Sequence, residues 1–395
     1  MAAVIPEYLA GLDFDPVERE RALDLMARLL EHYTNNTTDL ADEQWREPVA
    51  KYLDRDLWQR EMTQVIHRIP IPVGVSVEMP NPGDYKSVRV AGRTILLTRA
   101  HDGSLNAMIN VCRHRGMQLV PEGCGSARRF TCVYHAWSYG LDGTLLGVNG
   151  EEKFGPVDRD EFSLLRLACG ERAGLMFVCL TPGLEIDLDD WLGDVLPELE
   201  SLRLAQTVPF STRYLAGPNW KVTADGFLEG YHFASLHPET VAKTNFSNMQ
   251  AFDSFGPHLR NTFGLKALAR AVGTPREEWN PVDCLGVTYW LFPGLAVAGG
   301  WRQHTAGSIM LPGDSWELSM TQQTLLIRHE PYDDAERATA QAASDFFYNA
   351  FKDEDYTAQF QVQQGLASVP DEAHIFGRNE PGVQHFHRHL DRLMG

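Results

Sequence analysis

Two cysteines and two histidines stand in the sequence as two short mixed pairs. Cys112 and His114 form a C-x-H pair, seventeen residues follow, and Cys132 and His135 form a C-x-x-H pair. Two loops that each present a thiolate and an imidazole can hold two irons, one bound by both cysteines and the other by both histidines. A structural zinc site more often places its two cysteines together and its two histidines together. The spacing therefore favours a [2Fe–2S] cluster over a zinc site or four unliganded core residues.

A second group of candidate ligands lies further along the chain. Glu229 and His232 are three residues apart, so a helix would place both on one face, and His237 follows five residues later, just before Pro238. Two histidines and a carboxylate on one side of an iron leave open positions for O₂, as in non-heme Fe(II) oxygenases. Alone, the H-x₄-H spacing is weak, because two ordinary surface or core histidines are the default. It is also not the H-E-x-x-H pattern of zinc proteases.

Taken together, several segments resemble the alpha (large, catalytic) subunits of Rieske non-heme iron aromatic ring-hydroxylating oxygenases. The segments that carry the resemblance are 82–85, 102–103, 110–116, 132–137, 142–143 and 219–237. Val133 stands where the family usually has Pro, and Ala136 where it usually has Gly, but neither change removes a ligand. The resemblance implies that the four residues of the mixed pairs hold a Rieske [2Fe–2S] cluster.

The same resemblance implies that His232 and His237 bind a mononuclear iron. Family members take the third ligand, an Asp, from a late helix before a V-Q-x-G-L run. Asp355 stands at the matching distance before residues 362–366. Asp353 and Glu354 are alternatives, since a run of acidic residues is usually a solvated helix start.

Glu229 has a different implied role. In the family an acidic residue at this position bonds the iron-ligand His on one side and, on the other, a cluster-ligand His of a neighbouring subunit. A carboxylate that accepts N–H from two imidazoles fixes both rings. Most members use Asp, which is one methylene shorter than Glu. Asp225 is the alternative bridge, and Asn219, from the N-W-K part of the motif, is placed with the catalytic residues.

The cofactors and partners also follow from the resemblance. They are a [2Fe–2S] cluster, Fe(II), and O₂ as co-substrate. The chain has no G-x-G-x-x-G after a strand and no flavin fingerprint, so NAD(P)H acts only indirectly, through a separate reductase with or without a ferredoxin. The second ligand loop lacks the extra Cys that would pair in a respiratory Rieske protein, so Cys124 has no disulfide partner there. By analogy we expect a homotrimer, with or without a small beta subunit.

The expected activity is hydroxylation or cis-dihydroxylation of an aromatic or other hydrophobic small molecule. The alternative is a monooxygenase that carries out O- or N-demethylation or hydroxylates a quaternary ammonium or other non-aromatic substrate. A non-catalytic Rieske electron carrier and a zinc-stabilised binding protein are weaker alternatives. Six apolar residues are candidates to line the substrate pocket, although such side chains are equally often core: Phe227, Leu228, Trp290, Phe292, Trp301 and Met310.

Composition narrows the classes of function. The formal net charge of −18 argues against nucleic acid, whose binders bring Lys and Arg to the phosphates. No apolar run approaches the roughly 20 residues of a membrane span, and the N-terminus does not read as a signal peptide, so we expect a cytoplasmic protein. Six cysteines in 395 residues are too few for a disulfide scaffold.

The elements that must position these residues fall into three expected regions. Residues 1–49 should form a helical segment that packs on the catalytic domain, with an apolar stripe starting after Pro16. Residues 50–182 alternate short apolar runs with turn signals, which predicts an antiparallel β Rieske domain. Residues 183–395 should form the catalytic mononuclear iron domain. Their strands followed by helices predict an α+β, helix-grip-like fold with helices covering an antiparallel sheet.

Overall fold

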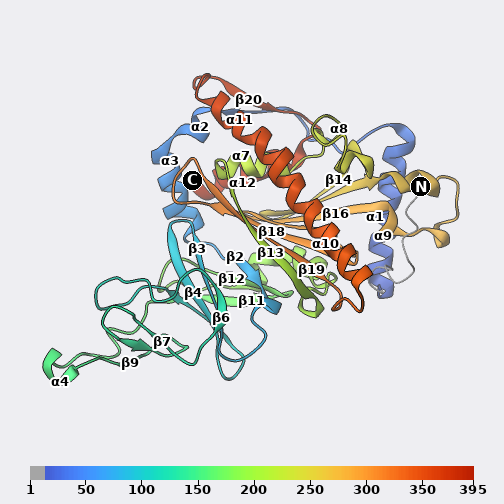
Figure 1. Cartoon of the computed structure of the whole chain (residues 1–395). Coiled ribbons are helices and arrows are strands. Elements are labelled where there is room, and N and C mark those ends of the chain that lie inside the picture. Colours follow the sequence, from blue (N-terminus) through green and yellow to red (C-terminus); the bar gives the residue numbers. More distant parts are fainter. Residues whose placement is uncertain (1–13) are drawn as a thin grey trace. The chain divides into compact units, whose positions relative to one another are not determined.

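The computed structural model describes residues 14–395, which form two compact units (Figure 1). One unit spans residues 60–191, and the other combines the segments before and after it. The 60–191 unit starts and ends later in the chain than the Rieske domain expected at residues 50–182. Within residues 14–395, no helix has both the length and the apolar composition that a bilayer crossing requires.

The 60–191 unit is built from short antiparallel strands, as expected. Its main sheet has the order β10-β5-β4-β3-β6, and two three-stranded sheets have the orders β11-β12-β2 and β7-β8-β9. The strands are β2 (Ile71–Val75), β3 (Asp84–Val90), β4 (Arg93–Arg99), β5 (Leu105–Ile109), β6 (Gly123–Ser126), β7 (Phe130–Thr131), β8 (Ser138–Tyr139), β9 (Leu145–Gly147), β10 (Arg166–Leu167), β11 (Cys169–Arg172) and β12 (Leu175–Val178). A short helix, α4 (Glu151–Phe154), follows β9.

The other unit is organised around one seven-stranded antiparallel sheet. Its order is β13-β19-β18-β17-β16-β15-β14, so all strands except the edge strand β13 follow one another as a meander. The strands are β13 (Val208–Gly217), β14 (Asn245–Phe255), β15 (His258–Leu265), β16 (Leu285–Leu291), β17 (Leu295–Ala298), β18 (His304–Pro312) and β19 (Ser319–Ile327). The expected antiparallel sheet in this part of the chain is confirmed.

Helices cover this sheet, and Figure 1 shows α10 and α11 running diagonally across its strands. A π-helical turn, η9 (Ala350–Asp355), joins α10 (Asp334–Asn349) to α11 (Tyr356–Leu366). The remaining helices are α1 (Pro16–Asn35), α2 (Ala50–Leu53), α3 (Arg55–Arg60), α5 (Leu188–Leu192), α6 (Leu196–Glu200), α7 (Trp220–Phe227), α8 (Phe233–Leu236), α9 (Pro281–Cys284) and α12 (Pro381–Met394). The expected helix-grip-like arrangement is therefore present.

The first helix, α1, begins where the sequence predicts. Asp15 caps it by accepting hydrogen bonds from the backbone N–H groups of Val17 and Glu18, and Pro16 occupies the first turn. Six residues of the predicted apolar stripe are buried, whereas Val17 is exposed. Arg28 on this helix donates to Asp253 on β14 at 2.8 Å, so α1 packs on the seven-stranded sheet.

Candidate metal centres and active-site cavity

The two cysteine–histidine loops have nearly the same backbone construction. In the first, the N–H of Cys112 donates to the carbonyl of Met117 at 2.7 Å, and the N–H of Gly116 donates back to the carbonyl of Cys112 at 3.0 Å. In the second, Cys132 bonds to Trp137 at 2.8 Å and Ala136 to Cys132 at 2.9 Å. Both loops close through a residue with positive φ, 79° at Gly116 and 57° at Ala136. The second loop therefore requires a positive φ at the position where the family usually has glycine. Ala136 adopts this φ at a conformational cost.

The loops bring the four predicted cluster ligands together. The rings of His114 and His135 lie 4.6 Å apart between centroids, and His114 stacks on Trp137 at 5.0 Å. Burial raises the pKa of the Cys112 thiol, and the neighbouring Cys132 thiol raises it further. The Cys112 sulfur also lies 3.4 Å from the hydroxyl of Tyr139.

This donor set fits a [2Fe–2S] cluster. Nδ1 of His114 is buried and has no hydrogen-bond partner among residues 14–395. An unpaired buried ring nitrogen beside a second imidazole and two buried thiols is costly unless a metal accepts its lone pair. The surrounding core includes Leu119, Phe130 and Leu141 and keeps the thiols away from solvent.

The second group of predicted ligands also converges. His232, His237 and Asp355 each offer one ligand atom, and these atoms all lie within 4.8 Å of one another. Nε2 of His237 lies 3.0 Å from Oδ1 of Asp355, and Nε2 of His232 lies 3.6 Å from the same oxygen. Asp355 comes from η9, so two segments far apart in sequence build one site. We refer to these three residues as the His232/His237/Asp355 triad.

Each histidine of the triad is held from behind by a glutamate. Nδ1 of His232 donates to Glu229, and Nδ1 of His237 donates to Oε2 of Glu354 at 2.6 Å. Thr240 donates a second hydrogen bond to Glu354 at 2.6 Å. A neutral imidazole that donates from Nδ1 has its lone pair on Nε2, so Nε2 facing a carboxylate oxygen calls for a cation between them. The donor set therefore fits a divalent metal such as iron.

The electrostatics of His237 agree with this arrangement. Burial lowers its pKa, but Asp355 and Glu354 outweigh burial, and the net effect is a raised pKa. The His237 ring is only 1% exposed. A buried ring that two carboxylates favour in the cationic form is a suitable place for a bound cation.

The segment that carries Glu229 and His232 is not the continuous helix that the sequence suggested. Helix α7 ends at Phe227, α8 starts at Phe233, and the residues between them are irregular. Gly230 in this irregular segment packs closely on β15, because a Cβ there would lie 2.8 Å from the ring of Phe263. Glu229 and His232 still meet, since the Glu229 carboxylate also accepts the backbone N–H groups of Tyr231 and His232.

Two other predicted catalytic residues make structural contacts outside the triad. Asn219 caps α7 by accepting the N–H of Lys221 at 2.8 Å, and its amide donates to the carbonyls of Tyr52 and Trp316. Asp225 accepts from the hydroxyl of Tyr52 at 2.6 Å and bonds Nε2 of His387 at 2.7 Å. These bonds engage both oxygens of Asp225, so Glu229 and not Asp225 contacts the His232 ring.

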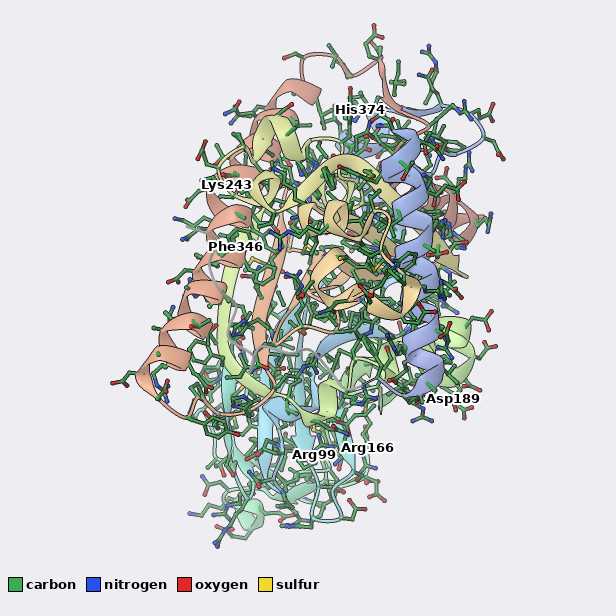
Figure 2. All side chains as sticks on the ribbon, turned by 90° about the vertical axis from the view of Figure 1, so that its right-hand side faces the viewer. Arg99, Arg166, Asp189, Lys243, Phe346 and His374 are labelled. Atoms are coloured by element: carbon green, nitrogen blue, oxygen red, sulfur yellow. The ribbon has the colours of Figure 1, made fainter. Side chains whose placement is uncertain are left out.

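A mostly apolar cavity of about 220 Å³ opens beside the triad. Its lining includes all three triad residues, Glu229 and Arg302. Six phenylalanines belong to the lining: Phe227, Phe233, Phe263, Phe346, Phe347 and Phe351. Figure 2 shows Phe346 on the α10–η9–α11 helical stretch, with Lys243 on a neighbouring segment.

Most of the predicted pocket residues are core. Phe227 lines the cavity, but the other five candidates do not. Trp290 and Phe292 pack on Phe386 of α12, and Trp301 donates to the hydroxyl of Ser201. All five are less than 5% exposed, and they are Leu228, Trp290, Phe292, Trp301 and Met310.

The sequence carried a signal for part of the true lining. Phe347, Phe351 and Asp355 are spaced by four residues, so a helical stretch presents them on one side. Phe233 directly follows His232. By contrast, Arg302, Thr288 and Ala296 belong to the sheet and its loops, where no helical spacing links them to the triad.

Comparison with known proteins places these two sites in one family. A model of the Rieske [2Fe–2S] domain matches residues 70–158, and a model of the ring hydroxylating alpha subunit (catalytic domain) matches residues 204–395.

Individual proteins agree with the family models. The carnitine monooxygenase oxygenase subunit of Escherichia coli (strain K12) is 28% identical over 369 residues, covering 89% of this chain and 94% of that protein. The benzene 1,2-dioxygenase subunit alpha of Pseudomonas putida is 31% identical over 255 residues, covering 61% of this chain and 56% of that protein. The crystal structure of the quaternary ammonium Rieske monooxygenase CntA with its substrate L-carnitine has the same fold. Its TM-score is 0.77 at 21% identity, covering 97% of this chain and 100% of that one.

Family members use a [2Fe–2S] cluster, a non-heme iron, O₂ and electrons from a reductase. With both domain models matched in order and both donor sets assembled, the chain belongs to the Rieske oxygenases as an alpha, catalytic subunit, an oxidoreductase that incorporates oxygen from O₂.

Proposed function

We propose that the chain is the terminal oxygenase of a monooxygenase system that acts on a small quaternary ammonium compound. The observation that carries this proposal is the cavity beside the triad, which six phenylalanine rings line. The faces of aromatic rings attract a quaternary ammonium group, which cannot donate hydrogen bonds and so needs no polar partner. Phenylalanine rings can hold such a group near a metal ion, and they have no atoms that would bind the metal themselves.

The comparisons support this choice over the aromatic hydroxylation that the sequence favoured. The carnitine monooxygenase subunit matches 89% of the chain, whereas the benzene dioxygenase subunit matches 61%. The alternative activity named from the sequence is thus the better supported one. A quaternary ammonium substrate also accounts for a cavity rich in phenylalanine.

The proposed reaction balances as a monooxygenation. One oxygen atom of O₂ enters a C–H bond on a carbon attached to the quaternary nitrogen, and the other leaves as water with two electrons and two protons. The hydroxylated carbon then releases the nitrogen, because a hydroxyl and an ammonium on one carbon break down to an aldehyde and a tertiary amine. The bound iron supplies the O₂ activation in this scheme.

The residues of the chain have three proposed tasks in this site. His232 and His237 bind the iron through Nε2, and Asp355 binds it through a carboxylate oxygen. Glu229 and Glu354 keep the proton of each ring on Nδ1, so that both Nε2 lone pairs point at the metal. The phenylalanine rings hold the substrate and exclude water from the reacting carbon.

We further propose that Glu229 links the triad to the cluster of a neighbouring subunit in a homotrimer. Its carboxylate already bonds the His232 ring, and a second imidazole on its outer side would complete the bridge. Cys112, His114, Cys132 and His135 hold that cluster in this proposal. The reductase supplies electrons one at a time. The proposed electron route requires neither a ferredoxin nor a beta subunit.

Single-turnover chemistry tests the function directly. The iron-loaded protein is reduced with dithionite and exposed to O₂ with γ-butyrobetaine or L-carnitine. We expect a tertiary amine and an aldehyde in equal amounts, with less than one turnover per cluster-reduced chain. Formation of a phenol or cis-diol from benzene or salicylate, with no product from either ammonium compound, would replace this proposal with aromatic hydroxylation.

A further inference from the structure

One cation lines the cavity without an ionic partner. Arg302 lies in the loop between β17 and β18 and contributes to the lining. Its Nε donates to the carbonyl of Val282 at 3.2 Å. Its two Nη atoms have no hydrogen-bond or ion-pair partner among residues 14–395. A guanidinium has five N–H donors, so most of its donor capacity is unused.

The backbone around Arg302 is fixed from three sides. Its N–H donates to the carbonyl of Gly299 at 3.1 Å, and its own carbonyl accepts from Nε of Arg328 at 3.1 Å. Gly299 has φ 98°, and a Cβ there would lie 2.5 Å from the carbonyl oxygen of His304. The loop backbone therefore fixes where the Arg302 side chain starts, and the Nε bond to Val282 anchors the side chain itself.

The electrostatic setting of Arg302 is unusual for a cation. Burial lowers its pKa, and Asp283 and Cys284 only partly oppose this effect. Asp283 does not form an ion pair with it, and its carboxylate accepts from the side chain of Asn280 at 2.9 Å. A partly desolvated guanidinium gains from an incoming anion, because a charge-assisted pair in such a setting is screened less than at a surface.

The cavity lining carries charges of both signs. Glu229, Asp355 and the two triad histidines form the metal end, while Arg302 is the one Lys or Arg among the described lining residues. The rest of the lining is mostly uncharged and includes the six phenylalanine rings. A ligand that matches this lining carries an anion at one end and an apolar or cationic group at the other.

We propose that Arg302 binds the carboxylate of the substrate and so selects compounds that carry a carboxylate at the end away from the reacting carbon. The bidentate geometry of a guanidinium matches a carboxylate and would fix the orientation of the molecule in the cavity. The identity of the other end of the substrate rests on the proposed function. With both proposals together, the substrate is a zwitterion with a quaternary ammonium and a carboxylate. The rings then hold the ammonium near the triad while Arg302 holds the other end.

Binding affinity tests this assignment on the reduced, iron-loaded protein. Equilibrium dialysis compares γ-butyrobetaine with its methyl ester, which keeps the ammonium but loses the anion. We expect the wild type to bind the acid about 100-fold more tightly than the ester, and Arg302→Gln to lose that preference. The ester should bind both proteins within about threefold. Arg302→Lys keeps the charge without the bidentate fork and should recover part of the preference.

Lys243→Gln is the matched control. Lys243 is an exposed cation that pairs with Glu239 at 2.7 Å, outside the cavity lining, so its loss should leave both affinities unchanged. The cluster absorption spectrum and the Tm of each variant report whether the protein is folded. Equal affinity of the wild type for acid and ester, or an unchanged acid affinity in Arg302→Gln, would overturn the assignment.

A second probe pair separates this inference from the proposed function. Benzoate and methyl benzoate differ in the same way but contain no ammonium. Arg302-dependent binding of benzoate, with no binding of γ-butyrobetaine, would uphold the carboxylate site and overturn the quaternary ammonium substrate. Turnover of γ-butyrobetaine and its ester at equal efficiency would uphold the function and overturn the carboxylate site. Failure of the wild type to prefer either acid over its ester rejects the role of Arg302.

Discussion

The two candidate metal sites of this chain are built in opposite ways. The cluster site uses two loops of the same construction, each closed by the same pair of backbone hydrogen bonds and each supplying one sulfur and one nitrogen. The triad instead joins an irregular segment after α7 to a π-helical turn more than a hundred residues later. Local loops can be recognised from their own residues, whereas a site joined across a fold depends on the packing of everything between its parts.

The two sites also differ in how their ligands are supported. In the cluster loops the support is mostly backbone, with Trp137 and Tyr139 packed against the ligands. In the triad the support is carboxylate, because Glu229 and Glu354 each bind a ring nitrogen. Backbone support tolerates side-chain variation, as Val133 and Ala136 illustrate, while carboxylate support makes specific side chains indispensable.

The largest effect should come from removing a triad ligand. His232→Ala removes one of three protein ligands, so we expect iron to fall from about three to about two per chain with the cluster spectrum intact. Oxygenation should drop at least about 1,000-fold, since the metal no longer activates O₂. Metal analysis and single-turnover product yield measure both. Cys132→Ser changes the other site and should remove the cluster absorption. If His232→Ala also lost the cluster, the two sites would not be independent.

Glu229→Gln should uncouple the sites while leaving both in place. The amide keeps the size of the side chain but removes the charge that accepts N–H from the His232 ring. We expect three irons to remain and reoxidation of the cluster by the mononuclear site to slow on the order of 100-fold. Stopped-flow absorbance of the reduced cluster after mixing with O₂ and substrate follows this step. A wild-type rate would remove Glu229 from the electron route.

Glu354→Gln should weaken the metal site without slowing the cluster. Glu354 is the only carboxylate that the structure places on Nδ1 of His237 within residues 14–395, and its loss frees that ring to change tautomer. We expect iron affinity to fall about 10- to 100-fold, measured by competition with a chelator. Asp353→Asn, one residue earlier and exposed, is the control, and an equal loss in both variants would point to general charge and not to the contact with His237.

The smallest expected effect compares the two cluster loops directly. Ala136 and Gly116 occupy the same loop position with φ 57° and 79°. Ala136→Gly should raise the free energy of unfolding by about 1 kcal/mol, and Gly116→Ala should lower it by about the same amount. No atom lies within 4 Å of a Cβ built on Gly116, so the cost there is conformational and not steric. Denaturant unfolding followed by cluster absorbance measures both, and shifts of the same sign would contradict the equivalence of the loops.

Prediction from sequence succeeded where chemistry and spacing were local. The Rieske [2Fe–2S] domain was predictable because each cysteine–histidine pair spans only a few residues and mixes sulfur with nitrogen. The antiparallel sheet and its covering helices followed from turn signals and apolar periodicity, and α1 began at its predicted cap. The roles assigned to the triad and to Glu229 stay predictions, although the structure brings these side chains together.

The failures have a common physical cause. Trp290 and Phe292 are large and apolar, and only the packing of α12 against their face decides that they are core. Asn219 looked catalytic because it stands in a motif, but its side chain satisfies the open end of a helix. The space for only a glycine at position 230 depends on the ring of Phe263, which lies on β15. Each of these outcomes depends on a neighbour distant in sequence.

A two-stranded sheet pairs β1 (Trp45–Pro48) with β20 (Ala373–Phe376), and this pairing has a consequence for the order in which the chain can fold. Trp45 to Pro48 lie opposite Phe376 to Ala373, so an early segment finds its partner strand only near the end of the described chain. The 60–191 unit is continuous and leaves the ribosome complete while that partner is still unsynthesised. All four candidate cluster ligands lie in this early unit, whereas Asp355 of the triad is synthesised more than 150 residues after it ends, so the two candidate metal sites are completed at different times during synthesis.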